Sequence, residues 1–153
     1  MSLLFHFYGI ILNFSILVSN INDWEYYNET NKYYKELREK MNWIPARQTC
    51  QNICPGSGDL ASIKDENATN FMKNKLSLHY SVWIGGEKKD GKWMWTDGTN
   101  FDYENWDSSR PYFVPSNGYS HYGSFFIMMS SGSSRTWYDK LNGYSYGALC
   151  QCM

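Results

Sequence analysis

The side chains best suited to chemistry lie in one irregular stretch, residues 107–124, with the sequence DSSRPYFVPSNGYSHYGS. Tyrosine and arginine favour recognition because they offer large contact areas and directional polar tips at low entropic cost, and aromatic rings can stack on the faces of sugars. The candidate ligand-binding residues are Arg110, Tyr112, Phe113, Tyr119, His121 and Tyr122, together with Asp139 further along the chain. The alternative is that several of these rings fill the space beneath a long loop.

Catalytic chemistry is not indicated by the sequence. Neither His79 nor His121 has a cysteine, a second histidine or an acid nearby at metal-ligand spacing. There is no G-x-S-x-G nucleophile motif and no glycine-rich phosphate loop. We therefore expect a non-enzymatic protein with no catalytic residues and no cofactor.

Four cysteines stand in two close pairs, Cys50 with Cys54 and Cys150 with Cys152. The first pair lies on a predicted helix and the second on a predicted strand, and in each case the spacing puts both residues on one face. Bridging within a pair would need strained local geometry. A helix docked on a strand favours Cys50–Cys150 with Cys54–Cys152, or the crossed pairing.

The N-terminal segment predicts an extracellular protein. Residues 1–19 are apolar and carry no Asp, Glu, Lys or Arg, which is typical of a secretory signal peptide, and they are too short and interrupted for a membrane span. We expect residues 20–30 to form an N-terminal extension and residues 31–153 to form one domain. In a secreted protein the cysteines are disulfide candidates, and the sequons at Asn28 and Asn67 predict glycosylation.

The charge balance limits the partners. The formal net charge is −1, from 14 basic and 15 acidic residues, so no basic face for nucleic acid is expected. The expected partner is a glycan or an extracellular protein, without a membrane span, and a homo-oligomer stays open.

Short elements must position these residues. A strand is predicted at residues 33–37, followed by a helix with Cys50 and Cys54 on one face that ends at Pro55-Gly56. Asp65 is expected to cap a second helix with the apolar stripe Ala68, Phe71, Met72 and Leu76.

The second half of the chain predicts strands and tight turns. Residues 82–84 are expected to form a buried strand stopped by Gly85-Gly86, and Asp90-Gly91 and Asp97-Gly98 predict turns because both dipeptides tolerate positive φ. Further strands are expected at residues 124–129, 135–138 and 146–152. The fold class is therefore α+β, with two helices packed on small antiparallel sheets and one long irregular loop.

The order of these motifs resembles the C-type lectin-like domain. WIGG, W-x-W-x-D-G and F-x-Y-x-N-W follow one another in residues 83–106, between a W-x-x-A-x-x-x-C helix at Trp43 and a W-x-D motif at Trp137. The resemblance spans roughly residues 33–152 and implies a Cys50–Cys150 disulfide. The family's other common disulfide has Phe125 or Phe126 and Asn142 at its positions here, so Cys54 with Cys152 is interpreted as its substitute.

The resemblance also raises the question of calcium. Family members that bind sugar through calcium use a Glu-Pro-Asn or Gln-Pro-Asp tripeptide and an Asn-Asp pair, because calcium requires several converging oxygens. This chain has Arg110-Pro111-Tyr112 and Tyr138-Asp139 instead. Only Asp139 keeps a ligand type, and Arg110 puts a fixed cation where a carboxylate should face the metal. A structural role in a turn after Trp137 is the preferred interpretation of Asp139, and Asp97 and Asn105 are likewise interpreted as turn formers.

Three functions follow as hypotheses. The first is a secreted C-type lectin-like module that binds a carbohydrate or protein ligand through its long loop without family-type calcium. The second is calcium-assisted sugar binding through substituted ligands such as Asp107 and Asp139. The third is a structural component of the extracellular matrix whose loop forms an oligomer interface.

Overall fold

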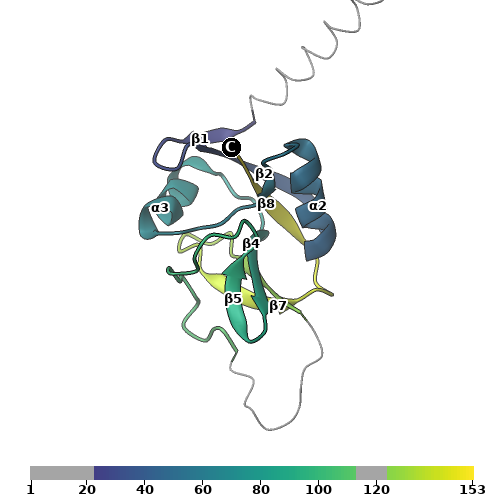
Figure 1. The fold of residues 1–153 in the computed structure, drawn as a ribbon. Coiled ribbons are helices and arrows are strands. Elements are labelled where there is room, and N and C mark those ends of the chain that lie inside the picture. Colours follow the sequence, from purple (N-terminus) through teal and green to yellow (C-terminus); the bar gives the residue numbers. More distant parts are fainter. Residues whose placement is uncertain (1–22, 113–123) are drawn as a thin grey trace, which may run out of the picture.

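The computed structural model describes residues 23–112 and 124–153. These residues form one mixed sheet and two helices (Figure 1). The strands are β1 (Glu25–Tyr27), β2 (Lys32–Met41), β3 (Asp59–Leu60), β4 (Val82–Lys89), β5 (Lys92–Trp95), β6 (Phe125–Met129), β7 (Trp137–Leu141) and β8 (Tyr146–Cys152), and the helices are α2 (Trp43–Ile53) and α3 (Glu66–Lys75). The predicted signal peptide lies outside the described residues.

The strand order is β1-β2-β8-β4-β6-β7, with β3 added to β8 and β5 added to β4. The first and last long strands, β2 and β8, pair antiparallel from Tyr33 opposite Cys152 to Leu37 opposite Ala148. Strands β4 and β8 pair in parallel. The α+β fold class is confirmed, although this parallel pair unites the expected small sheets into one. β1 lies within residues 20–30, so part of the segment predicted as an extension belongs to the sheet.

The two helices cover opposite faces of the β2–β8 pair (Figure 1). Side chains alternate between faces along a strand, so Leu149 of β8 packs in the cluster that contains α3, whereas Ala148 and Cys150 pack in the cluster that contains α2. Within residues 23–112 and 124–153 no helix has the length and apolar character needed to cross a bilayer.

Helix α2 docks through one face. Trp43, Ala46 and Cys50 are buried at the i, i+3, i+7 spacing of a core-facing stripe, and the helix ends at Ile53, just before Pro55-Gly56. The structure pairs Cys50 with Cys150 and Cys54 with Cys152, the uncrossed arrangement.

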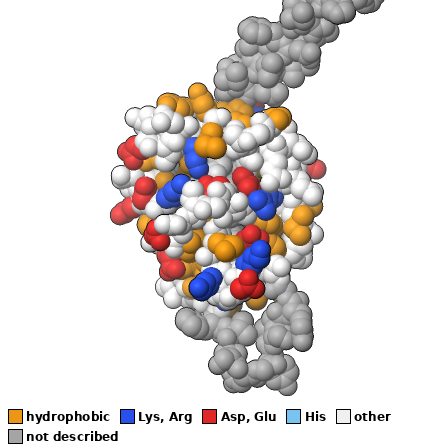
Figure 2. Space-filling model, viewed as in Figure 1, with side chains coloured by type: hydrophobic (Ala, Val, Ile, Leu, Met, Phe, Trp, Pro, Cys, Tyr) orange, Lys and Arg blue, Asp and Glu red, His pale blue; other side chains and the backbone are white. Residues whose placement is uncertain are grey.

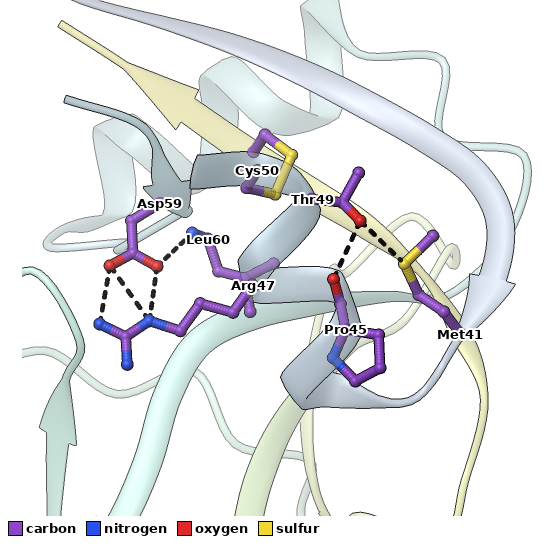
Figure 3. The surroundings of a disulfide bond; sticks show 8 residues. Met41, Pro45, Arg47, Thr49, Cys50, Asp59 and Leu60 are labelled. Carbon is purple, nitrogen blue, oxygen red and sulfur yellow. Dashed lines mark hydrogen bonds and ion pairs between the residues drawn. A yellow bond between two sulfur atoms is a disulfide. The ribbon is translucent and has the colours of Figure 1, made fainter. Parts of the chain in front are cut away.

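A bidentate ion pair lies next to the Cys50 disulfide, where the Arg47 guanidinium holds Asp59 at 3.0 Å through both oxygens (Figure 3). Phe126, one of the two residues that the resemblance offers for the family's other cysteine position, is buried and stacks on Trp43 with the ring centroids 4.1 Å apart.

Helix α3 begins as predicted. The Asp65 carboxylate accepts a hydrogen bond from the Ala68 backbone N at 2.7 Å, which satisfies one of the free donors of the first turn. Ala68, Met72 and Leu76 are buried, and Phe71 packs against them and stacks on Tyr27.

The prediction that Gly85-Gly86 stop a strand is wrong, because β4 runs through both glycines to Lys89. A Cβ at Gly85 would lie 2.7 Å from the Leu60 carbonyl oxygen, and one at Gly86 would overlap Ile127. The glycines therefore permit close approach of neighbouring chain segments rather than a turn. The turn follows later, at Asp90 and Gly91, whose φ values of 51° and 78° join β4 to β5 as expected.

Most of the tryptophans serve the core. Trp83 and Trp137 are fully buried, and Trp137 makes edge contacts with Trp95, Tyr103 and Trp106 at 5.5–5.7 Å between ring centroids. The high aromatic content is thus largely a packing feature. On the face shown in Figure 2, positive and negative side chains lie interspersed, which agrees with the near-neutral composition.

Candidate functional site

The candidate site begins where the long loop starts after Trp106, which lies beside the outer strand β7. The Trp137 backbone N donates to the Asn105 carbonyl at 2.8 Å, and the Asp107 backbone N donates to the Trp137 carbonyl at 3.0 Å. The Asn105 side-chain amide also donates to the Arg135 carbonyl at 3.0 Å. Asn105 is therefore a structural residue that fixes the loop's point of departure.

Asp139 lies in the middle of β7 with only 3% of its side chain exposed. The Arg110 guanidinium donates to one of its oxygens at 3.3 Å, and the Tyr112 backbone N donates to the other at 3.2 Å. The peptide bond between Arg110 and Pro111 is cis. Asp139 does accept a backbone hydrogen bond, but the expected local turn is wrong because β7 continues to Leu141. Its partners come instead from the start of the long loop.

The second acidic residue near the loop, Asp107, also has its carboxylate oxygens engaged in hydrogen bonds. Its oxygens accept hydrogen bonds from the Tyr138 hydroxyl at 2.7 Å and from the Ser109 backbone N and hydroxyl at 3.3 and 3.1 Å. The hydrogen bond from Tyr138, aided by Ser109, holds the pKa of Asp107 below its ordinary value.

These groups do not fit a family-type calcium site. A divalent cation near Asp139 would meet the Arg110 guanidinium, which already neutralises that carboxylate. Across residues 23–112 and 124–153, no three or more His, Cys, Asp or Glu side chains converge as a metal-binding group. Asp107 and Asp139 are engaged with tyrosine and arginine donors rather than directed toward a shared vacant point.

Arg110 is also the first cation in a surface row of tyrosines. Its guanidinium lies 3.9 Å from the centroid of the Tyr112 ring and 5.6 Å from that of Tyr138. The Lys140 ammonium lies 5.7 Å from the Tyr138 centroid and 5.3 Å from that of Tyr144. We name the tyrosine–cation row by its members, which are Tyr112, Arg110, Tyr138, Lys140, Tyr144 and Tyr146.

The structure brings together three of the predicted ligand-binding residues, Arg110, Tyr112 and Asp139. Tyr112 is 62% exposed, so it does not fill space beneath the loop. The other predicted residues, Phe113, Tyr119, His121 and Tyr122, lie outside the described residues. Sequence reasoning missed the tyrosines and lysine that follow Trp137, although the Tyr138-x-Lys140 and Tyr144-x-Tyr146 alternation places each pair on one side of the chain.

A polar cluster where β2 begins and β8 ends has a structural role. Asp97 accepts hydrogen bonds from Lys32 at 3.2 Å, Ser62 at 2.6 Å, Gln151 at 3.0 Å and the hydroxyl and backbone N of Thr99 at 2.6 and 3.1 Å. The contacts to Thr99 agree with the interpretation of Asp97 as a turn former. A cavity of about 370 Å³ borders this cluster, but the polar groups satisfy one another.

Both sequon asparagines are exposed, Asn28 in the turn between β1 and β2 and Asn67 in the first turn of α3. Glycosylation at these two sites stays a prediction.

Two disulfides that join helix α2 to the last strand β8, within the mixed sheet described above, are typical of the C-type lectin-like fold. The profile of the family described as "Lectin C-type domain" matches residues 39–152, and the chain belongs to this family. The family matches are lectins and lectin-like binding proteins, which are non-enzymatic.

Individual relatives agree with this assignment. The chain is 30% identical to the C-type lectin lectoxin-Lio3 of Erythrolamprus poecilogyrus over 77% of this chain and 73% of that protein. It is 37% identical to a lectin of Pleurodeles waltl over 53% of this chain, and it spans about half the length of that relative. Among solved structures, a calcium-independent type II antifreeze protein superposes with a TM-score of 0.68 at 27% identity, covering 84% of this chain and 90% of that chain.

Proposed function

We propose that this protein is a secreted recognition module that binds a carbohydrate or protein ligand at the start of its long loop without family-type calcium. One observation carries the proposal: the Arg110 guanidinium and the Tyr112 backbone N hold both oxygens of Asp139. Asp139 is the residue that keeps a calcium-ligand type, and a cation of the protein itself already pairs with it. A ligand would then be bound by the exposed ring and polar tips of the loop rather than by a metal.

Two further facts support the proposal. One structure with the same fold is named a calcium-independent type II antifreeze protein, so the fold is compatible with a function that needs no calcium. The two disulfides are consistent with secretion, because such bonds form and persist in oxidising compartments.

The test is a glycan-array screen of the mature protein in calcium and again in EDTA. We expect the same glycans to be bound in both conditions, because no metal ion takes part in the proposed binding. Binding that disappears in EDTA would favour the calcium-assisted hypothesis through Asp107 and Asp139. If no glycan binds in either condition, a protein ligand becomes the object of the search.

Changing Arg110→Glu is expected to create a calcium response that the natural chain lacks. The substitution places a second carboxylate opposite Asp139, where Arg110 now donates, and two facing carboxylates repel until a cation binds between them. We expect the melting temperature of this variant to rise by about 3–6 °C in millimolar calcium, which corresponds to roughly 1 kcal/mol for a domain of this size.

The matched control is Arg110→Gln, which removes the cation without adding a carboxylate and should show no calcium response. Differential scanning fluorimetry in calcium and in EDTA measures all three proteins. A calcium-dependent rise in the melting temperature of the unmodified protein would contradict the proposal.

A further inference from the structure

We propose that the tyrosine–cation row binds an anionic saccharide, with the Lys140 ammonium contacting its acidic group and the exposed Tyr144 ring contacting a sugar face. The inference rests on the proposed function and specifies its ligand. Arg110 and Tyr112 belong both to the row and to the proposed site at the start of the loop, so the two form one continuous surface.

The row alternates rings and cations in space. Arg110 lies over the Tyr112 and Tyr138 rings, and Lys140 lies over the Tyr138 and Tyr144 rings, with all four distances to ring centroids between 3.9 and 5.7 Å. Tyr138 and Lys140 are two residues apart on β7 and therefore extend from the same face of the sheet. Each cation is held over an aromatic face, which keeps it in place while leaving its charge available.

Lys140 is the cation in this row whose charge is not neutralised by a carboxylate. Arg110 is paired with Asp139, whereas Lys140 forms no ion pair among residues 23–112 and 124–153. Residues 1–22 and 113–123 contain no Asp or Glu, so the rest of this chain cannot supply an acidic side chain either. A carboxylate or sulfate group of a ligand would form an ion pair with the Lys140 ammonium.

The rings beside Lys140 are held from behind. The Tyr138 hydroxyl donates to Asp107 at 2.7 Å, which anchors the tip of that side chain. Tyr144 is 52% exposed and stacks on Tyr146 with the rings 13° from parallel. Tyr146 in turn packs edge-on against the fully buried Trp83 at 4.9 Å. Rings positioned in this way lose little freedom when a ligand stacks on them, so less binding energy is spent on ordering.

The exposed Tyr144 ring next to an unneutralised ammonium favours a sugar that carries an acidic group over a neutral sugar. The membership of the chain in a lectin family favours a saccharide over an acidic peptide. The acidic group could be a carboxylate, as in sialylated glycans, or a sulfate, and the two are separated by the choice of probe.

The experiment is a titration of the mature protein, in EDTA, with 3′-sialyllactose, 3′-sulfolactose and lactose, followed by calorimetry or NMR. We expect at least one anionic sugar to bind about tenfold more tightly than lactose, the amount that one charge-assisted contact typically contributes, and this preference to fall as salt is raised. Lys140→Gln should abolish the preference, and Tyr144→Ala should weaken binding of all three sugars.

The matched control is Lys88→Gln, because Lys88 also lies over an aromatic ring, 5.8 Å from the Trp93 centroid, on the β4–β5 hairpin outside the tyrosine–cation row. Both lysines are on the surface, and unchanged melting temperatures will verify that the variants fold. If lactose binds as tightly as the anionic sugars, or if Lys140→Gln behaves like Lys88→Gln, the inference is overturned while the proposed function stands. If an acidic peptide binds through Lys140 and none of the sugars does, the saccharide assignment is overturned. Failure of every glycan on the array would instead remove carbohydrate recognition from the proposed function.

Discussion

Removing both disulfides together is expected to lower the free energy of unfolding by about 7 kcal/mol, whereas removing either alone should cost only about 2–3 kcal/mol. Each bridge by itself closes nearly the same loop, with sequence separations of 100 and 98. Once one is formed, the other closes only a small ring, because Cys50 and Cys54 are four residues apart and Cys150 and Cys152 are two apart. Stabilisation in the chain-entropy description grows with the logarithm of loop length, so either bridge alone retains most of the effect.

The measurement is urea denaturation of the oxidised protein, of Cys50→Ala with Cys150→Ala, of Cys54→Ala with Cys152→Ala, and of the variant with all four changes. A domain of this kind typically has 5–15 kcal/mol of stability in total, so a loss of about 7 kcal/mol removes about half of that stability or more. If its loss were no greater than the summed losses of the two single-bridge variants, the bridges would act through local packing, and the argument from loop closure would be wrong.

Asp97→Ala is expected to lower the free energy of unfolding by about 3–5 kcal/mol, the typical cost of leaving a buried charge without its partner. The carboxylate accepts hydrogen bonds from Lys32, Ser62, Thr99 and Gln151, and its removal leaves the Lys32 ammonium buried without a counter-ion. Lys32→Met should cost much less, about 1 kcal/mol, because Asp97 keeps the other three donors and a buried ammonium is removed.

The same cluster predicts a pH dependence. Burial by itself would raise the pKa of Asp97, but hydrogen bonds from Ser62, Thr99 and Gln151 outweigh it and hold that pKa well below the ordinary value. Burial lowers the pKa of Lys32, although Asp97 opposes this shift. A carboxyl whose pKa is lowered by folding adds stability above its unfolded pKa of about 4 and loses that stability as the pH falls further.

Urea denaturation at neutral pH and at pH values below about 4 measures both the cost of the Asp97 substitution and the loss of stability in acid. The loss of stability in acid should be smaller in Asp97→Asn than in the unmodified protein, since the substituted side chain does not titrate. Asp102→Ala, at an exposed residue of the neighbouring loop, is the control and should change stability by no more than about 0.5 kcal/mol. A cost for Asp97→Ala close to that of the control would contradict the role of this cluster.

Much of the fold could be predicted from the sequence because its signals are local. The cap at Asp65, the buried face of α2 and the turn at Asp90-Gly91 each depend on a few neighbouring residues, and all three are present in the structure. The order of the lectin motifs predicted the family, and the matched profile confirms it. The paired glycines at 85–86 failed as a local signal, because a strand glycine can equally mark close approach of another segment, here at Leu60 and Ile127.

The sequence by itself determined that this is an α+β, non-enzymatic domain of the C-type lectin family with most of the usual calcium ligands replaced. Only the tertiary structure decided what the replacements do. Arg110 and Asp139 are 29 residues apart, and Lys32 and Asp97 are 65 apart, so no local pattern could show that they are paired. The tyrosine–cation row likewise joins the start of the loop, strand β7, the turn after it and the first residue of β8. Such contacts depend on strand register and on which faces pack together, and these are set by the fold as a whole rather than by the neighbouring residues of each side chain.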